Sequence, residues 1–413
     1  MNRYLQCLIV LVSAGAVLAT ALPEAESARK ASMAESRLIT DKNDVYLFPQ
    51  VGAEHSQLVS LDYGPAAGSG GGLALLGDEA FTFGVGVFRG DLLDTPAFFP
   101  HPSETSRLGN IATPVENGPM PHTVLDLFAS SDIGAGLVGG RLSLGTGGSA
   151  SVTSEDETIR DSQTFAALTA GYSMVDDFRL DSSLTLRYSG ATEFNETIEE
   201  TDEQTLGEGN AFLVGANVRG YSPMVDDLDL GFLADLHFET DTWVDDPDQP
   251  DDFIESRENQ FALLGGAGPV YYIDETTIAG YGVLGYTRST SDANVNDDDV
   301  LSTFTSQTVL PGLHVAADIE VFEWLYFRSG IQYNFDIESG GGDVDPDDED
   351  ATRDSTFSRS QGDGFAWRTG IGVEVDRFTL DGVFQQGFIA NGPDFLGGAG
   401  GGMFTMVSAA YRF

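Results

Sequence analysis

Along most of the chain, apolar and polar residues alternate one by one. Segments 178–189, 228–239 and 325–336 show this most clearly, because nearly every second residue is apolar or aromatic and the residues between are mostly polar, charged or small. A period of two places successive side chains on opposite faces of a β-strand. The pattern therefore predicts an all-β protein whose strands carry one apolar and one polar face.

The connections between these segments come in two alternating kinds. Short ones, such as 175–177 and 225–227, follow long ones that are acidic or rich in glycine. Outer-membrane β-barrels have short periplasmic turns and long external loops, whereas a soluble sandwich, the alternative, does not require this inequality. We expect long loops at 89–121, 147–161, 191–209, 241–257, 289–301, 338–363 and 390–401.

The number of strand segments predicts the size of the barrel. Candidate strands begin near residues 57, 70, 80, 122, 133, 162, 178, 210, 228, 259, 276, 303, 323, 364, 378 and 403. These make one antiparallel transmembrane barrel of about 16 strands, an even number that places both barrel ends on the periplasmic side. Because the first two segments are short, a wall of about 14 strands is the alternative if they form a hairpin outside it.

The net charge and the N-terminal residues limit the possible partners and the cellular location of the protein. The formal net charge is −45, from 65 acidic and 20 basic residues, so nucleic acid is excluded as a partner by repulsion. Residues 1–21 have the pattern of a signal peptide, with Arg3, an apolar stretch and the Ala19-Thr20-Ala21 cleavage motif. The only cysteine, Cys7, lies within it. We expect a signal peptide at 1–21, a periplasmic segment or plug at 22–55 and a barrel at 56–413.

The final strand carries a more specific signal. From Met403 to Phe413, alternate residues form an apolar face that ends in Tyr411 and Phe413, while Arg412 lies on the other face. In this the chain resembles bacterial outer-membrane β-barrel proteins, including porins, whose last strand ends on phenylalanine. The resemblance implies an outer-membrane location and recognition of Tyr411 and Phe413 by the barrel-assembly machinery.

A second resemblance lies near the N-terminus. The stretch from Asp44 to Gln50, Asp-Val-Tyr-Leu-Phe-Pro-Gln, resembles the N-terminal hatch of the long-chain fatty acid transporter family. Of the family's Asn-Pro-Ala turn only Pro49 is matched. The resemblance implies that 29–55 forms a hatch inside the barrel, and a plain linker is the alternative.

The polar face of the strands indicates what lines the lumen. A lumen with charges of both signs favours a water-filled passage that filters solutes, although these charges could also pair across strands. Nearly all the bases are arginines, which stay charged at any working pH. The residues assigned to the lumen are Arg179, Asp181, Arg187, Arg219, Asp229, Asp235, His237, Glu239, Asp318, Arg328, Asp336, Arg368, Glu374, Asp381 and Arg412.

Two acidic loops have the alternating oxygen ligands of a calcium site. They contain the weak candidates Asp292, Asn294 and Asn296, and Asp343, Asp345 and Asp347. Both lack the glycine and the final glutamate of an EF-hand, so no resident metal and no cofactor are expected. Loose divalent cations bridging these loops to lipopolysaccharide phosphates remain a hypothesis, and solvated loops are the alternative.

Catalysis has little support in the sequence. The histidines at 55, 101, 122, 237 and 314 form no metal motif, and no Gly-x-Ser-x-Gly elbow occurs. We therefore expect that the protein is not an enzyme. We expect a porin-like channel for passive diffusion or facilitated uptake of small solutes. The alternatives are a hydrophobic-substrate transporter with an N-terminal hatch, and an occluded barrel that acts through its surface loops. The expected partners are small solutes, outer-membrane lipid and lipopolysaccharide.

Overall fold

The computed structural model describes residues 27–63, 70–78, 80–87, 123–154, 157–176, 178–197, 203–245, 254–295, 299–342, 358–384 and 404–413. The predicted signal peptide at 1–21 lies outside these residues. The described strands are β1 (Leu58–Tyr63), β2 (Gly70–Gly77), β3 (Phe81–Val87), β4 (Thr123–Asp132), β5 (Leu137–Ser154), β6 (Glu157–Val175), β7 (Arg179–Thr197), β8 (Glu203–Val225), β9 (Leu228–Asp245), β10 (Ile254–Ile273), β11 (Thr276–Val295), β12 (Asp299–Phe322), β13 (Leu325–Gly342), β14 (Ser358–Val375), β15 (Phe378–Phe384) and β16 (Phe404–Arg412).

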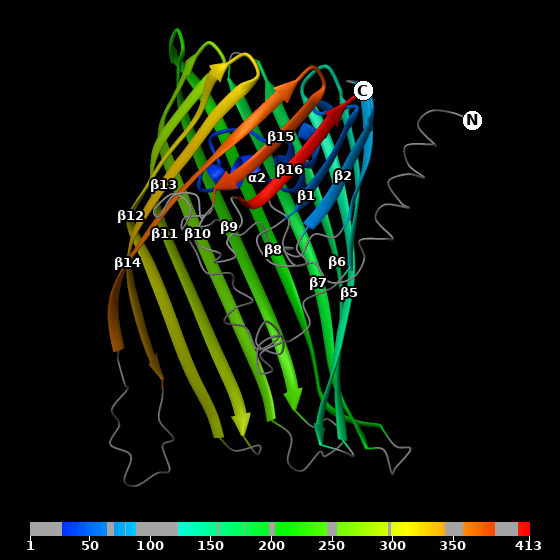
Figure 1. The fold of residues 1–413 in the computed structure, drawn as a ribbon. Coiled ribbons are helices and arrows are strands. Elements are labelled where there is room, and N and C mark those ends of the chain that lie inside the picture. The colour runs from blue at the N-terminus through cyan, green and yellow to red at the C-terminus, as the bar shows by residue number, and fades with distance from the viewer. Residues whose placement is uncertain are drawn as a thin grey trace, which may run out of the picture.

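These strands form one closed antiparallel barrel, in which each strand pairs with its neighbours in sequence and β1 pairs with β16 (Figure 1). The barrel closes with Leu58 opposite Arg412, and the amide of Phe413 donates to the carbonyl of Gln57 at 3.0 Å. The prediction of 16 strands is confirmed, and the 14-strand alternative is wrong. The short β1 and β2 belong to the wall because their backbone groups complete the hydrogen bonding of β16 and β3.

The two faces of each strand behave as the alternation predicts. On β9, Leu236 and Phe238 point outward and are exposed, whereas Asp235 and His237 point inward and are buried. The outward face of the membrane-crossing part is apolar. At its extracellular limit five neighbouring strands carry an outward aromatic, beyond which most of the described outward residues are small, polar or charged: Tyr188, Phe212, Phe238, Phe261 and Tyr286. This apolar belt with its aromatic boundary is the surface of an outer-membrane barrel.

The strands differ greatly in length around the barrel. Strands β5–β14 contain 18 to 24 residues, whereas β1 has 6 and β15 has 7. About 9–11 tilted residues cross the bilayer, so the long strands extend beyond it on the side of the long connections. The sequence makes several of these strands too short at their extracellular ends: β8 begins at Glu203 and β5 continues to Ser154, both inside predicted loops. Paired neighbours extend the hydrogen bonding there, and a solvated extension needs no apolar face.

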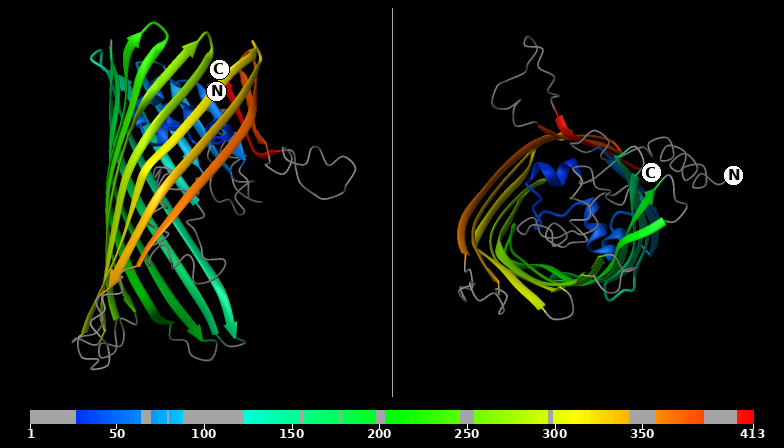
Figure 2. Two further views of the ribbon diagram at one scale, coloured as in Figure 1. Left: turned by 90° about the vertical axis from the view of Figure 1, so that its left-hand side faces the viewer. Right: turned by 90° about the horizontal axis from the view of Figure 1, so that it is seen from below.

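Residues 27–57, which we call the plug, lie inside the barrel at the end that carries the short turns and the C-terminus (Figures 1 and 2). Three buried clusters join the plug to the wall. Their plug members are Met33, Leu38 and Ile39 in the first, Val45, Tyr46, Leu47, Phe48 and Val51 in the second, and Ala28 and Ala31 in the third. The interior of the periplasmic end is therefore a packed core.

No helix among the described residues is long and apolar enough to cross a membrane.

Candidate functional site at the periplasmic end of the lumen

Local signals in the sequence shape the plug into three short helical turns. Helix α2 (Ala28–Ser32) begins at Ser27, whose side chain accepts from the amide of Lys30. The 3-10 helix η1 (Lys42–Tyr46) has a capping box made by Asp41 and Asp44. The second 3-10 helix, η2 (Pro49–Ala53), starts with proline at its first position, where a missing amide hydrogen costs nothing. These turns hold the charged side chains of the plug in fixed directions.

Ion pairs tie the plug to the wall around the circumference of the barrel. The plug contributes charges of both signs, and its partners among the described residues lie on six strands. Among the described residues the pairs are Arg29–Asp318, Arg37–Asp235, Lys42–Asp62, Glu54–Arg179, Asp44–Arg219 and Glu35–Arg368, and Arg219 and Arg179 both reach Asp181 on β7. Three of the six arginines assigned to the lumen from sequence, Arg179, Arg219 and Arg368, thus bind the plug.

Arg219 on β8 is the centre of this network. Its guanidinium donates to Asp181 at 2.9 Å and to Asp44 of the plug, and its side chain is only 2% exposed. It also lies over the ring of Phe48, 4.8 Å from the ring centroid. Burial alone would raise the pKa of Asp44, but Arg219 and Lys30 outweigh it and hold the pKa of that carboxyl well below its usual range. Asp44 is therefore ionised at any physiological pH.

A chain of hydrogen bonds fixes the plug residues that follow α2. The amide of Arg37 donates to the hydroxyl of Tyr281 at 3.3 Å, and that hydroxyl lies 2.7 Å from Nδ1 of His314. Nε2 of His314 lies 3.2 Å from the carbonyl of Met33. Because a carbonyl only accepts, we assign the proton to Nε2, so Nδ1 accepts from Tyr281. Arg37 also pairs with Asp235.

Glycines on the inner wall let the plug backbone approach closely. A Cβ atom on Gly330 of β13 would lie 2.1 Å from the carbonyl carbon of Met33. A Cβ atom on Gly139 of β5 would lie 2.4 Å from the amide nitrogen of Gln50. Backbone cannot give way as a side chain can, so only glycine fits at either point.

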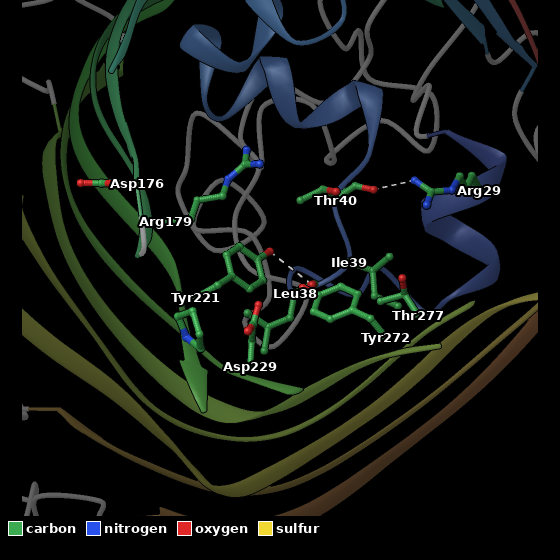
Figure 3. A pocket seen from close by; sticks show the side chains of 11 residues that line it. Arg29, Leu38, Ile39, Thr40, Asp176, Arg179, Tyr221, Asp229, Tyr272 and Thr277 are labelled. Carbon is green, nitrogen blue, oxygen red and sulfur yellow. Dashed lines mark hydrogen bonds between the residues drawn. The ribbon is translucent and has the colours of Figure 1, made fainter. Parts of the chain in front are cut away.

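A cavity of about 270 Å³ lies between the plug and the wall at the periplasmic end (Figure 3). Leu38, Ile39 and Thr40 form its plug side. The carbonyl of Leu38 accepts from the hydroxyl of Tyr221 at 3.2 Å, and that of Thr40 accepts from Arg29. Its remaining lining residues are Arg29, Asp176, Arg179, Tyr221, Pro223, Asp229, Tyr272 and Thr277. The cavity therefore combines charges of both signs with two tyrosine rings.

The lumen wall beyond the plug is also polar. Arg187 on β7 pairs with Glu239 on β9 at 2.6 Å across the intervening β8. His237 is buried on β9 between Asp235 and Glu239, and Asn217 is buried on β8 opposite Asp235. Among the described residues, neither ring nitrogen of His237 nor the side-chain oxygen of Asn217 has a hydrogen-bond partner. This part of the wall is therefore polar and buried.

The remaining predicted site residues lie in several places. Asp381 and Asp318 both bind Arg328 within the lumen, while Glu374 and Arg412 are exposed on inward positions at the periplasmic rim. Tyr411 is exposed on the outer face, with its ring 5.8 Å from that of Phe413.

Most of the candidate calcium ligands cannot be placed. The side chain of Asn294 and residues Asn296, Asp343, Asp345 and Asp347 lie outside what the structure describes. The same holds for the side chain of Asp336, which was predicted to line the lumen. Asp292 is half-buried on β11. No group of three or more His, Cys, Asp or Glu side chains in the described part of the chain is placed to bind a metal ion.

The sequence does not reveal several residues that build this site. Tyr281 and His314 bind across the lumen, yet each stands alone in sequence without a motif. Gln50 ends the stretch that resembles a hatch, but nothing in that stretch indicates its partner on the wall. Gln50 donates to the hydroxyl of Ser173 at 3.0 Å. The inward glycines Gly139 and Gly330 were the available signal, because glycine weakens a strand unless another backbone comes close.

No protein-family model matches the chain, and no curated protein matches it in sequence. Among solved structures, the siderophore receptor PiuA from Acinetobacter baumannii is 8% identical, with a TM-score of 0.36, over 63% of this chain and 46% of that chain. The ferric yersiniabactin uptake receptor FyuA from Yersinia pestis is 10% identical, with a TM-score of 0.35, over 86% and 79%.

The translocator domain of the autotransporter NalP from Neisseria meningitidis is 12% identical, with a TM-score of 0.30, over 75% of this chain and 96% of that chain. This chain thus spans less than half of the PiuA chain that it matches. At these identities and scores, the comparisons add nothing about function to what the geometry shows.

Proposed function

We propose that this outer-membrane β-barrel is an uptake channel for small polar solutes, and that its plug is the gate. The observation that carries the proposal is the plug itself, which is packed into the periplasmic end of a lumen with a polar wall. A solute that reaches the plug can leave on the periplasmic side only if part of the plug moves.

The lining of the lumen supports a polar solute. Arg187, Glu239, His237 and Asn217 face the interior beyond the plug, and the two charged groups neutralise each other. A polar wall of this kind favours a solute that can form hydrogen bonds, because an apolar solute next to it would leave polar groups without partners.

The part of the plug best placed to move is the stretch 36–41. It forms one side of the periplasmic cavity, and it is held by specific links to Tyr221, Tyr281 and Asp235 rather than by helical hydrogen bonds. If these links open together, the cavity would join the lumen.

A reversible cross-link tests whether this stretch must move. Leu38 lies against Gly231 of β9, where a Cβ atom would be 2.8 Å from Cδ1 of Leu38. Because the two positions are in contact, we propose a Leu38→Cys/Gly231→Cys variant to form a disulfide, in a mature chain otherwise free of cysteine if the predicted signal peptide is removed. We expect proteoliposomes with the oxidised variant to take up little small sugar, and a reductant to restore uptake. The two single-cysteine variants are the controls.

Equal uptake by the oxidised and reduced double variant would contradict the proposal that the plug is a gate.

A second candidate function, uptake of hydrophobic substrates, is favoured by Leu38, Ile39 and the tyrosine rings in the cavity. Uptake of a radiolabelled fatty acid but not of sugars by the same proteoliposomes would select it. If neither class of solute entered the proteoliposomes at all, an occluded barrel that acts through its surface would be the better account.

A further inference from the structure

The outer surface of the barrel carries exposed arginines on the extracellular side of the apolar belt. Most described arginines point into the lumen or plug, or lie at the periplasmic rim. Arg160 on β6, Arg257 on β10 and Arg288 on β11 instead occupy outward positions, and all three are exposed. They share strand faces with the lipid-facing residues Leu168, Leu263 and Leu284, each of which is also exposed.

These arginines lie just beyond the apolar belt on the extracellular side. Arg288 is directly opposite Phe261, one of the aromatics that mark the boundary, and it is the next outward residue after Tyr286. Arg257 is four residues beyond Phe261 on the same strand. With about 3.3 Å per residue and tilted strands, the two guanidinium groups lie roughly 5–10 Å above the aromatic level. That is the level of the lipid headgroups.

The strongly acidic composition of the chain makes basic side chains at the headgroup level significant for lipid binding. The chain has 65 acidic and 20 basic residues, so its general field repels a phosphorylated lipid. Bases at headgroup level offset this repulsion locally, and the arginine fork matches two phosphate oxygens. In the strand register, Asp292 lies opposite Arg257, and Phe261 and Ser306 lie opposite Arg288.

We propose that the outward face of β10 and β11 binds the phosphate groups of lipopolysaccharide directly, through Arg288 with Arg257 beside it. This site needs no bridging divalent cation, unlike the acidic loops considered from the sequence. Arg160 on β6 provides a separate contact farther around the barrel. The proposal is independent of any role of the plug.

Binding of purified lipopolysaccharide to the refolded mature protein tests the site. The assay is carried out in detergent with excess EDTA, and the bound lipid per barrel is measured by native mass spectrometry over a concentration series. We expect an Arg257→Gln/Arg288→Gln variant to bind roughly tenfold or more weakly than the wild type, since each headgroup contact of a base is worth about a factor of five. Arg377→Gln is the matched control, because Arg377 is exposed at the periplasmic rim.

Heat-modifiability on gels shows that each variant is folded. The proposal is overturned if the double variant binds as tightly as the wild type, or if Arg377→Gln weakens binding equally. It is also overturned if the wild type binds lipopolysaccharide only after calcium or magnesium is restored, because the acidic loops would then account for binding. Retained binding of phosphate-free lipid by the wild type with the same affinity would likewise exclude recognition of phosphate.

Discussion

Arg219 on strand β8 and Asp44 in the plug lie 175 positions apart in sequence and form a buried ion pair in the lumen. Arg219 bridges from there to Asp181 on the neighbouring strand β7, so one side chain connects the plug to two strands of the wall. A buried charge without its partner is costly, which makes this pair a lock on the position of the plug.

Replacing Arg219 by Gln should therefore release the plug. The change leaves Asp44 and Asp181 buried without their main counter-charge, and loss of one partner of a buried pair typically costs about 3–5 kcal/mol. We expect protease to cut within 27–57 and the ion conductance to rise. Arg187→Gln is the matched control, because the described ion pair of Arg187 is with Glu239 of the wall. Equal effects of the two variants would show that general lumen charge, and not the lock, is responsible.

Enlarging the wall glycines should displace the plug while the strands stay paired. Gly330→Ala places a methyl group against the backbone of Met33, and Gly139→Ala places one against Gln50. Alanine is compatible with a strand, so the barrel itself should still fold. We predict that both variants are heat-modifiable on gels yet have higher conductance than the wild type. Gly280→Ala, with no atom within 4 Å of the added carbon, should behave as the wild type.

The hydrogen-bond chain through Tyr281 should hold the backbone of the plug near Arg37. Tyr281→Phe removes the hydroxyl that accepts from the Arg37 amide and donates to His314, at a cost of about 1–3 kcal/mol for the buried groups left unpaired. Hydrogen exchange measured by mass spectrometry should then be faster in peptides that contain Arg37. Tyr286→Phe alters an outward tyrosine on the same strand and should leave that exchange unchanged. If exchange near Arg37 did not change in either variant, other contacts would hold this stretch.

Plug docking should weaken in acid. Burial opposes ionisation of Asp41 and Asp44, but Arg29 beside the first and Arg219 beside the second lower both pKa values in the docked plug. A carboxyl whose pKa is lowered on docking stabilises the docked state fully above its ordinary pKa of about 4, and that contribution is lost as the pH falls further. Conductance should thus be constant from neutral pH to about pH 4 and rise below it. The Asp44→Asn variant should conduct more at pH 7 and show a smaller rise in acid.

The sequence predicted the wall well because strand alternation is a local property. In 228–239 the pattern of apolar and polar residues gives the orientation of every side chain on β9, since the period of two allows no other arrangement. The extracellular strand ends were misplaced because the solvated extensions, such as the start of β8, have no apolar face to mark them.

The plug could not be predicted in the same way. Residues 29–55 have no periodicity, and the partners of their charges lie on strands throughout the chain, as Asp318 on β12 does for Arg29. A lumen-facing arginine has the same sequence signature whether it lines open water or binds a plug. Only the three-dimensional arrangement distinguishes these cases, which is why the sequence left a porin and a hatched transporter both open.

The central claim, that residues 27–57 close the periplasmic end of the barrel, is tested most directly by planar-bilayer conductance. The refolded wild type is compared with a variant that lacks residues 27–56, after both have been shown to be heat-modifiable on gels. The account predicts small or rare openings for the wild type and a large, steady conductance for the deletion variant. A large, steady conductance of equal size in both proteins would contradict it.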